Sequence, residues 1–284
     1  MSASKLRQRT LTALLIAPLA AAAILLLPAP YLALCLGLVL MPAAWEWSAM
    51  AGIVSRAGRL AYVTGVVLCL LMLWQPPLRQ WHVHMIAAAA VFWCVVAFLL
   101  LRLRTFERKS GPDPMMATVG LVVLMGPWLA IVHLHAHSSA GPWWVLFLLV
   151  LIWVADTLAY FTGRRWGRIK LAPLLSPGKT RAGVYGALVG AGLCGVLSGW
   201  SLGLPPGYMV LFIAFCVLVA LVSIVGDLFE SLVKRRRDLK DSGQLLPGHG
   251  GILDRIDSLT AAAPFFTLGI LWLDAQSMIL SSGG

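Results

Sequence analysis

The sequence predicts an all-α protein that crosses a membrane about nine times, with a cytoplasmic N-terminus and an external C-terminus. Three observations lead to this fold class. Of the 284 residues, 60% are hydrophobic and 12% are charged. This composition contains too few polar residues to form a water-soluble surface. Apolar runs of about 20 residues, long enough for a helix to cross a bilayer, recur along the chain. Basic residues are concentrated in alternate connecting segments, as the positive-inside rule describes.

The apolar runs indicate helices, because they are too long and too uniformly apolar for the alternating strands of a membrane barrel. The predicted spans, in chain order, are residues 10–28, 31–50, 58–75, 83–101, 115–134, 142–162, 183–203, 207–229 and 260–280.

The first of these spans has an alternative interpretation. Lys5, Arg7 and Arg9 precede an alanine-rich apolar run, a pattern that is also typical of a signal peptide. No clear small-residue cleavage site follows the run before the next apolar segment. We therefore expect a retained span, and the later topology is the same in either case.

The distribution of charge sets the predicted orientation. All of the 22 basic residues except Arg79 fall in segments that would face the cytoplasm if the N-terminus does. This bias accounts for the net charge of +11 without a nucleic-acid partner. We expect a multi-pass protein of the inner, cytoplasmic membrane with its active site on the cytoplasmic face.

Two regions are predicted from the positions of the polar segments. Residues 1–140 contain about five spans and little else. Residues 141–284 carry two cytoplasmic loops, at 163–182 and 230–259, and form the predicted catalytic region. Glu46, near the inner end of the second span, is assigned no role.

Two acidic residues lie inside predicted spans, near their cytoplasmic ends. Asp156 lies roughly 9 Å deep at 1.5 Å per residue, and Asp227 lies at a similar depth beside Gly226, which allows close helix approach. Acids in a membrane are usually paired or functional, because their insertion is unfavourable. Each can pair with a loop arginine and fix helix packing, but two acids at one depth also favour a Mg²⁺ site.

The segment SPGKT ends in a sequence similar to part of a phosphate-binding P-loop. Pro173 stands where the first glycine of that motif is required, and no strand is predicted before it, so the motif fails. Its residues lead into the predicted helix at 183, whose N-terminus favours anions. A simple helix cap explains them equally well. The residues concerned are Ser176, Gly178, Lys179 and Thr180.

The long hydrophilic segment from Lys234 to Ser258 is the strongest functional signal. Binding to anionic lipid would account for the run of basic residues alone. It does not account for the acidic residues and glycines that follow. Glycines let a backbone approach a ligand closely, and carboxylates suit Mg²⁺. Phosphate-binding cations followed by acids are what a nucleotide with its metal requires. The residues concerned are Lys234, Arg235, Lys240, Asp241, His249, Gly250, Gly251, Asp254, Arg255 and Asp257.

These residues, with Ser231, Gly243, Leu246 and Pro247, resemble the full signature of the phosphatidate cytidylyltransferases, also called CDP-diacylglycerol synthases. The segments DTLAYFTGRRWGR, SPGKT and GDLFES resemble the same family, so the similarity covers at least residues 153–258. One departure is Arg181-Ala182, where relatives often carry an aromatic or aliphatic residue followed by Glu or Gln. The N-terminal spans resemble the family mainly in hydropathy.

The resemblance implies transfer of a cytidylyl group from CTP to phosphatidic acid, giving CDP-diacylglycerol and pyrophosphate with Mg²⁺. The expected partners are CTP, phosphatidic acid from the inner leaflet, the lipid bilayer and a second copy of the chain, without nucleic acid. The site would contain one or two metal ions, since two anionic substrates must be aligned. The expected catalytic residues are Asp227, Asp254, Lys240, Asp241 and His249. The expected substrate-binding residues are Ser176, Gly178, Lys179, Thr180, Lys234, Arg235, Gly250, Gly251 and Arg255. The expected metal ligands are Asp156, Asp227, Asp254 and Asp257.

Three other functions fit this sequence less well. A transporter with Asp156 and Asp227 as ion relays would show broken helices and an internal repeat. A lipid-binding assembly factor leaves the glycine-flanked His249 unexplained. A membrane kinase is the nearest enzymatic rival. Five outer histidines, at positions 82, 84, 133, 135 and 137, are interpreted as exposed interfacial residues or as a fortuitous metal site.

Overall fold

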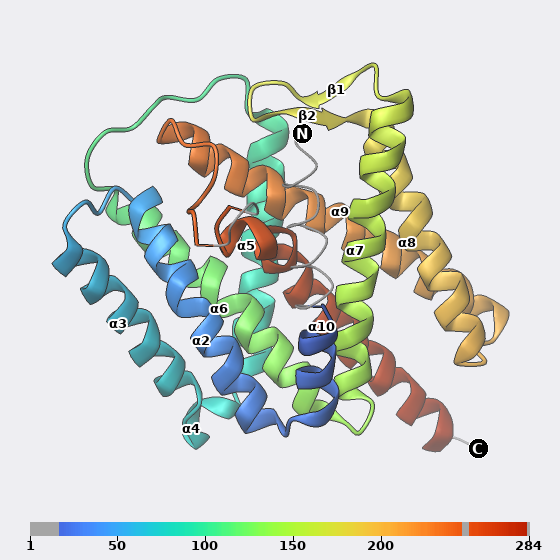
Figure 1. Ribbon diagram of the computed structural model, residues 1–284. Coiled ribbons are helices and arrows are strands. Elements are labelled where there is room, and N and C mark those ends of the chain that lie inside the picture. The colour runs from blue at the N-terminus through green and yellow to red at the C-terminus, as the bar shows by residue number, and fades with distance from the viewer. Residues whose placement is uncertain (1–16, 246–249, 283–284) are drawn as a thin grey trace.

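The computed structural model describes residues 17–245 and 250–282, with side chains described to residue 275. Figure 1 shows a bundle of long helices with a small two-stranded sheet at one end. Within the described residues, eight helices are long and apolar enough to span a membrane. The all-α, polytopic membrane class predicted from the sequence is therefore confirmed.

The helices follow the predicted spans closely. They are α2 (Ala29–Met50), α3 (Arg56–Leu73), the short α4 (Pro76–Arg79), α5 (His82–Arg102), α6 (Pro114–His137), α7 (Gly141–Trp166), α8 (Arg181–Ser201), α9 (Pro206–Arg236) and α10 (Leu253–Ser282). The described part of the predicted first span is a shorter apolar helix, Ala17–Leu26. Residues 10–16 lie outside the described residues, so the count of nine spans stays a prediction.

The connecting segments divide the molecule into two ends. We call the upper end in Figure 1 the basic end; it carries residues 51–55, 103–113, 167–180 and 237–245. We call the opposite end the histidine end. Among the described residues, every lysine and arginine except Arg79 lies in the basic end or near a helix terminus that reaches it. This separation agrees with the charge bias seen in the sequence.

The polar segments are more ordered than the sequence indicates. α9 continues to Arg236, past the predicted end at residue 229, and α10 begins at Leu253 rather than at residue 260. The predicted loop 230–259 is therefore too long. Long basic side chains can reach water from the last helical turn, and the i,i+4 pair Glu230–Lys234 supports the extension.

The other predicted loop, 163–182, contains an antiparallel hairpin that the sequence did not indicate. Strand β1 (Lys170–Ala172) pairs with β2 (Ser176–Thr180), with Lys170 opposite Thr180 and Ala172 opposite Ser176. Both strands are short, and β2 contains proline and glycine, which are depleted in strands. The hairpin lies across the basic end, above α7 and α8 (Figure 1).

Close helix contacts bring the polar side chains together. A side chain at Gly226 on α9 would place its Cβ 2.4 Å from the Asp257 carbonyl oxygen on α10, so the two helices meet there without an intervening side chain. At Gly186, α8 comes similarly close to α7, where a Cβ would lie 2.7 Å from the Leu158 carbonyl oxygen. The predicted close approach beside Asp227 is confirmed.

Candidate active site

A polar cavity of about 310 Å³ opens at the basic end between the hairpin, α9 and α10. Its lining consists mainly of charged side chains, most of which belong to the long hydrophilic segment singled out from the sequence. The lining residues are Leu175, Ser176, Lys179, Asp227, Ser231, Lys234, Arg235, Lys240, Asp241, Asp254, Arg255 and Asp257. We refer to this space as the polar cavity.

A second cavity of about 450 Å³ lies between α7, α8 and the hairpin. Its lining includes apolar residues of the membrane-spanning helices beside a few polar ones. Among the lining residues are Asp156, Ala159, Tyr160, Arg164, Lys170, Leu171, Gly178, Thr180, Val184 and Ile224. Lys179 and Asp227 line both cavities, so the two spaces meet at this pair.

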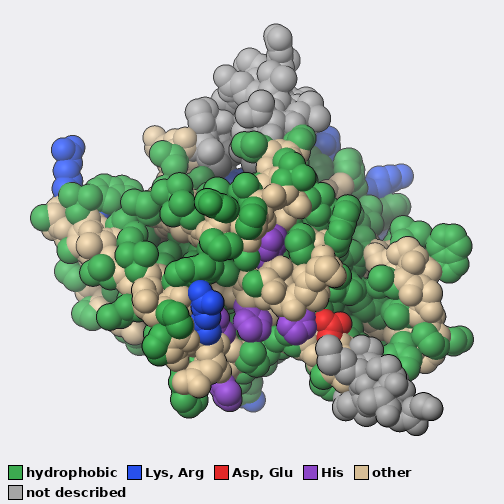
Figure 2. Space-filling model, turned by 90° about the horizontal axis from the view of Figure 1, so that it is seen from below, with side chains coloured by type: hydrophobic (Ala, Val, Ile, Leu, Met, Phe, Trp, Pro, Cys, Tyr) green, Lys and Arg blue, Asp and Glu red, His purple; other side chains and the backbone are tan. Residues whose placement is uncertain are grey.

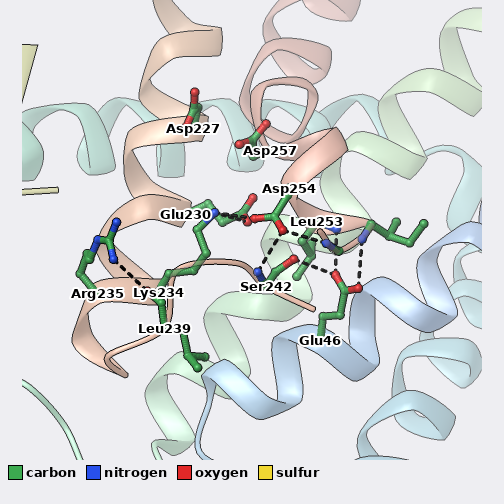
Figure 3. Close-up of polar contacts among 12 residues, drawn as sticks. Glu46, Asp227, Glu230, Lys234, Arg235, Leu239, Ser242, Leu253, Asp254 and Asp257 are labelled. Carbon is green, nitrogen blue, oxygen red and sulfur yellow. Dashed lines mark hydrogen bonds and ion pairs between the residues drawn. The ribbon is translucent and has the colours of Figure 1, made fainter. Parts of the chain in front are cut away.

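Lys179 on β2 forms an ion pair with Asp227 on α9. The two side chains are 23% and 30% exposed, so both can contact a ligand. Asp257 on α10 lies beside Asp227 in Figure 3. Asp156 and Asp257 each interact electrostatically with both Asp227 and Lys179. Lys179 is therefore in direct contact with Asp227 and within electrostatic range of Asp156 and Asp257.

The donor chemistry of this cluster is compatible with Mg²⁺. Within the part of the chain that the structure describes, no three His, Cys, Asp or Glu side chains form a ready-made metal set. Mg²⁺ is commonly held by one or two carboxylates together with substrate phosphates and water. Asp227 and Asp257 offer that partial set at the wall of the polar cavity, where a cationic group already lies.

A buried charge network adjoins the polar cavity. Lys234 Nζ lies 2.6 Å from Asp254 Oδ1 and 3.1 Å from Glu230 Oε1 (Figure 3). The side chains of Lys234, Glu230 and Asp254 are 11%, 5% and 8% exposed. Because buried charges are unfavourable unless paired, Lys234 is a structural link between α9 and α10 as well as part of the cavity wall.

Asp254 also organises the segment that precedes α10. Its Oδ2 accepts hydrogen bonds from Gly251 N at 2.8 Å and from Ser242 N at 3.0 Å. Gly250 has φ +82°, and a Cβ there would lie 2.6 Å from Asp254 Oδ2, so only glycine fits this left-handed position beside the carboxylate. Asp254 thus has three partners in this structure, and its predicted roles in catalysis and metal binding stay predictions.

The hairpin residues have local partners that the sequence did not reveal. Thr180 Oγ1 accepts a hydrogen bond from Gly183 N at 3.1 Å and so caps α8. The N–H of Arg181 donates to the Ile169 carbonyl oxygen at 3.0 Å. The N–H groups of Gly183 and Arg181 are therefore not free for the anion site predicted at this helix N-terminus. Arg235 Nε donates to the Leu175 carbonyl oxygen at 3.3 Å, which ties the hairpin to α9.

Most predicted site residues come together in space. Lys179, Asp227, Asp254, Asp257 and their basic neighbours line the polar cavity, whereas Asp156, Gly178 and Thr180 line the second cavity. Gly250 and Gly251 lie beside Asp254. His249 lies outside the described residues.

Three buried or half-buried polar residues were missed by sequence reasoning. Glu230 stands four residues before Lys234 on α9, a spacing that indicates an ion pair. Glu46 contacts the segment before α10. Arg237 donates to the carbonyl oxygens of Met50, Lys109 and Gly111 at 2.8, 2.9 and 2.7 Å, respectively. No local pattern indicates the last two, because their partners are far away in sequence.

Asp113 anchors the loop that Arg237 contacts. Its side chain accepts hydrogen bonds from Lys109 Nζ at 2.8 Å and from Met116 N at 3.2 Å, and it caps α6. The hydrogen bond from Lys109 is the main reason that the pKa of this carboxyl is below its usual value, with the Met116 amide adding to it. The cap therefore remains ionised at neutral pH and fixes the loop beside the end of α9.

The histidines gather at the histidine end, where Figure 2 shows them beside an acidic side chain. His82 and His135 are buried rather than exposed as predicted, because their Nε2 atoms bond to the carbonyl oxygens of Leu73 and Ile24 at 2.9 and 2.8 Å. His137 Nε2 lies 3.1 Å from Asp274 Oδ2. In the described residues these side chains do not form a set that could hold a metal ion.

The chain is similar in sequence to a family of known proteins. A model of the cytidylyltransferase family matches residues 7–272. The phosphatidate cytidylyltransferase of Pseudomonas aeruginosa is 40% identical over 94% of this chain and 97% of its own length. The protein of the same name from Haemophilus influenzae is 36% identical over 92% and 97%, respectively. A third, from Brucella abortus, is 47% identical over 49% of this chain and 51% of its own.

Proposed function

The chain belongs to the cytidylyltransferase family, and we propose that its polar cavity and second cavity bind the two substrates of one transfer reaction. The enzyme transfers a cytidylyl group from CTP to phosphatidate and forms CDP-diacylglycerol and pyrophosphate in the membrane. The observation that carries the assignment of the site is the junction of the two cavities at Lys179 and Asp227.

The lining of each cavity suits one substrate. Arg235, Lys240 and Arg255 in the polar cavity suit the triphosphate of CTP, because basic side chains form charge-assisted hydrogen bonds with phosphate oxygens. The second cavity combines Arg164 and Lys170 with apolar residues of α7 and α8. Such a lining suits a lipid that has an anionic headgroup and acyl chains in the bilayer. The two phosphates would then meet beside Lys179.

The reaction is a displacement at phosphorus. A phosphate oxygen of phosphatidate attacks the α-phosphorus of CTP, a new P–O bond forms, and the bond to the bridging oxygen of pyrophosphate breaks. The attacking phosphate is already ionised, so no general base is needed. Alignment and charge neutralisation dominate the barrier. Lys179 is placed to hold the two reacting phosphates together, while the other basic residues of the polar cavity hold the departing pyrophosphate.

We assign the Mg²⁺ site to Asp227 and Asp257, and Asp156, which lines the second cavity, adds negative charge to it. When bound, a divalent ion would polarise the phosphoryl group and reduce repulsion between the anionic substrates. The carboxylates that interact with Lys179 support this assignment, because three carboxylates and one ammonium group leave an excess of negative charge that favours a further cation. Asp227 and Asp257 belong to helices in direct contact at Gly226, so their spacing is fixed by the fold.

Isotope position in CTP tests the proposed reaction. We expect purified protein to transfer label from [α-³²P]CTP, but not from [γ-³²P]CTP, into the lipid fraction in the presence of phosphatidate and Mg²⁺. Excess chelator should stop the transfer. Incorporation of the γ label would indicate a kinase and contradict the assignment, and full activity in chelator would contradict the metal requirement.

We also propose that the basic end faces the cytoplasm, because basic residues are retained on that side of the inner membrane. Two exposed glutamines at opposite ends form a matched pair for labelling, Gln244 and Gln80. In a chain whose native cysteines are replaced by alanine, an impermeant thiol reagent should label Gln80→Cys in intact cells. Gln244→Cys should react only after permeabilisation. Labelling of Gln244→Cys in intact cells would overturn both the orientation and the supply of CTP to the site. The homodimer suggested by family resemblance stays a prediction.

A further inference from the structure

We propose that Glu46 on α2 is a positioning residue for the transfer reaction, because it fixes the start of α10 and with it Asp254 and Arg255. The inference rests on the proposed function of the polar cavity. Glu46 does not line that cavity, and it is distant in sequence from every residue that does.

The carboxylate of Glu46 caps the first turn of α10 from another helix. Its Oε1 accepts a hydrogen bond from Ile252 N at 3.0 Å, and its Oε2 accepts one from Leu253 N at 2.9 Å (Figure 3). Helix N-termini have N–H groups without intrahelical partners, and a negative charge there is favourable. Most caps come from a neighbouring residue, whereas this one is 207 residues away from Leu253.

Ser242 connects Glu46 to Asp254. The Ser242 hydroxyl donates to Glu46 Oε2 at 2.9 Å, and the Ser242 N–H donates to Asp254 Oδ2 at 3.0 Å. Asp254 also accepts from Gly251 N, the amide next to the one that Glu46 binds. Two carboxylates therefore bind adjacent amides of the same short backbone segment. A shift of Glu46 would be passed to Asp254 through Ser242 and residues 251–253.

The absence of side chains at two glycines makes room for this carboxylate. A Cβ at Gly243 would lie 2.5 Å from Glu46 Oε1, and one at Gly251 would lie 2.4 Å from Glu46 Oε2. Neither glycine has a positive φ. Their small size, rather than their backbone freedom, is what this contact requires.

The position of Glu46 is itself fixed. The next residue, Trp47, is fully buried, donates to the Met116 carbonyl oxygen at 2.9 Å and stacks on Phe229 of α9. One turn later, Met50 accepts the hydrogen bond from Arg237 at the end of α9. The end of α2 is therefore bound to α9, so Glu46 holds α10 in register with the helix that carries Asp227.

The burial of Glu46 argues against a purely stabilising role. Glu46 is 5% exposed, and it takes part in none of the ion pairs found among the described residues. Burial of a carboxylate is unfavourable, and its hydrogen bonds mainly offset that cost. Retaining such a group next to the cavity is explained by the geometry that it imposes on Asp254 and Arg255.

Glu46→Gln tests the inference with little change in size. The amide keeps one acceptor oxygen, and its NH₂ group cannot accept the second set of hydrogen bonds. We expect kcat to fall about 10–100-fold, the loss typical when a group that orients a metal-binding side chain, as Asp254 is expected to be, is removed, with KM for phosphatidate unchanged. The amides of Ile252 and Leu253 should exchange hydrogen faster. Glu107→Gln, in an exposed loop, is the matched control and should behave as wild type.

A double-mutant cycle with Gly243 tests the contact directly. Gly243→Ala should lower kcat as Glu46→Gln does, because its methyl group displaces the carboxylate. In a Glu46→Ala background the same alanine should cause no further loss, since the three atoms nearest to its Cβ all belong to Glu46. Gly65→Ala, with no atom within 4 Å of its Cβ, controls for the glycine replacement.

Each outcome bears on the inference. Unchanged kcat and unchanged amide exchange in Glu46→Gln would overturn it. A loss of activity accompanied by faster exchange throughout the protein would also overturn it, because that result indicates general destabilisation. Additive effects of Glu46→Ala and Gly243→Ala would exclude the contact. If the wild-type protein transferred no cytidylyl group, the proposed function would fail, and the exchange at residues 252 and 253 would still test the cap.

Discussion

Replacing Asp227 by asparagine is expected to lower kcat for cytidylyl transfer by about 10³-fold while the protein stays folded. A bound metal supplies several kcal/mol of transition-state stabilisation, and about 1.4 kcal/mol corresponds to a tenfold change in rate. Asp227 lines both cavities and pairs with Lys179. Its side chain is 30% exposed, so the ion pair contributes little to stability. The measurement is kcat and the Mg²⁺ concentration for half-maximal activity in purified protein.

Asp238→Asn is the matched control for this change. Asp238 follows the end of α9 and forms an exposed ion pair with Arg108, with both side chains more than 70% exposed. Its φ of 60° is tolerated by asparagine. We expect wild-type activity in this variant. An Asp227→Asn enzyme with normal kcat and normal Mg²⁺ dependence would refute the assignment of the metal to Asp227.

The membrane fold is predictable from the sequence because burial in lipid requires long apolar helices. The observed bounds of α5, α6 and α8 differ little from the predicted spans. The errors occur where an apolar run ends before its helix does. α9 and α10 continue into charged sequence because Glu230, Lys234 and Asp254 neutralise one another between the two helices. A hydropathy profile does not detect charges that neutralise one another between two helices.

The candidate site is predictable in part for a related reason. Lys234, Asp254 and Asp257 are close in sequence to the helix ends that meet in space, so one motif contains much of the cavity wall. Glu46 and Arg237 act across large sequence separations, and their partners are mainly backbone groups. Because every residue has backbone N–H or C=O groups, a contact with the backbone does not depend on the type of the partner residue and leaves no pattern in the sequence. Only the three-dimensional arrangement reveals these two contacts.

Replacing Lys234 by methionine is expected to destabilise the protein by about 3–5 kcal/mol, the typical result of removing one partner from a buried charge pair. Lys234 contacts Glu230 and Asp254, which are both nearly buried. Without the ammonium group, two carboxylates would face each other with no cation between them. The apparent melting temperature of the detergent-solubilised protein measures the effect, and activity should be lost in parallel because Asp254 would move.

A second substitution separates the charge from the packing. In Lys234→Met with Glu230→Gln, one of the two buried negative charges is absent, so part of the lost stability should return because the two carboxylates no longer repel each other. Asp254 remains charged and keeps its hydrogen bonds from the Gly251 and Ser242 amides. Lys234→Arg keeps the charge and should be milder than Lys234→Met. If Lys234→Met melted as wild type does, the network would not join α9 to α10. Recovery of stability without recovery of activity in the double variant would indicate that the cation serves the substrate as well as the fold.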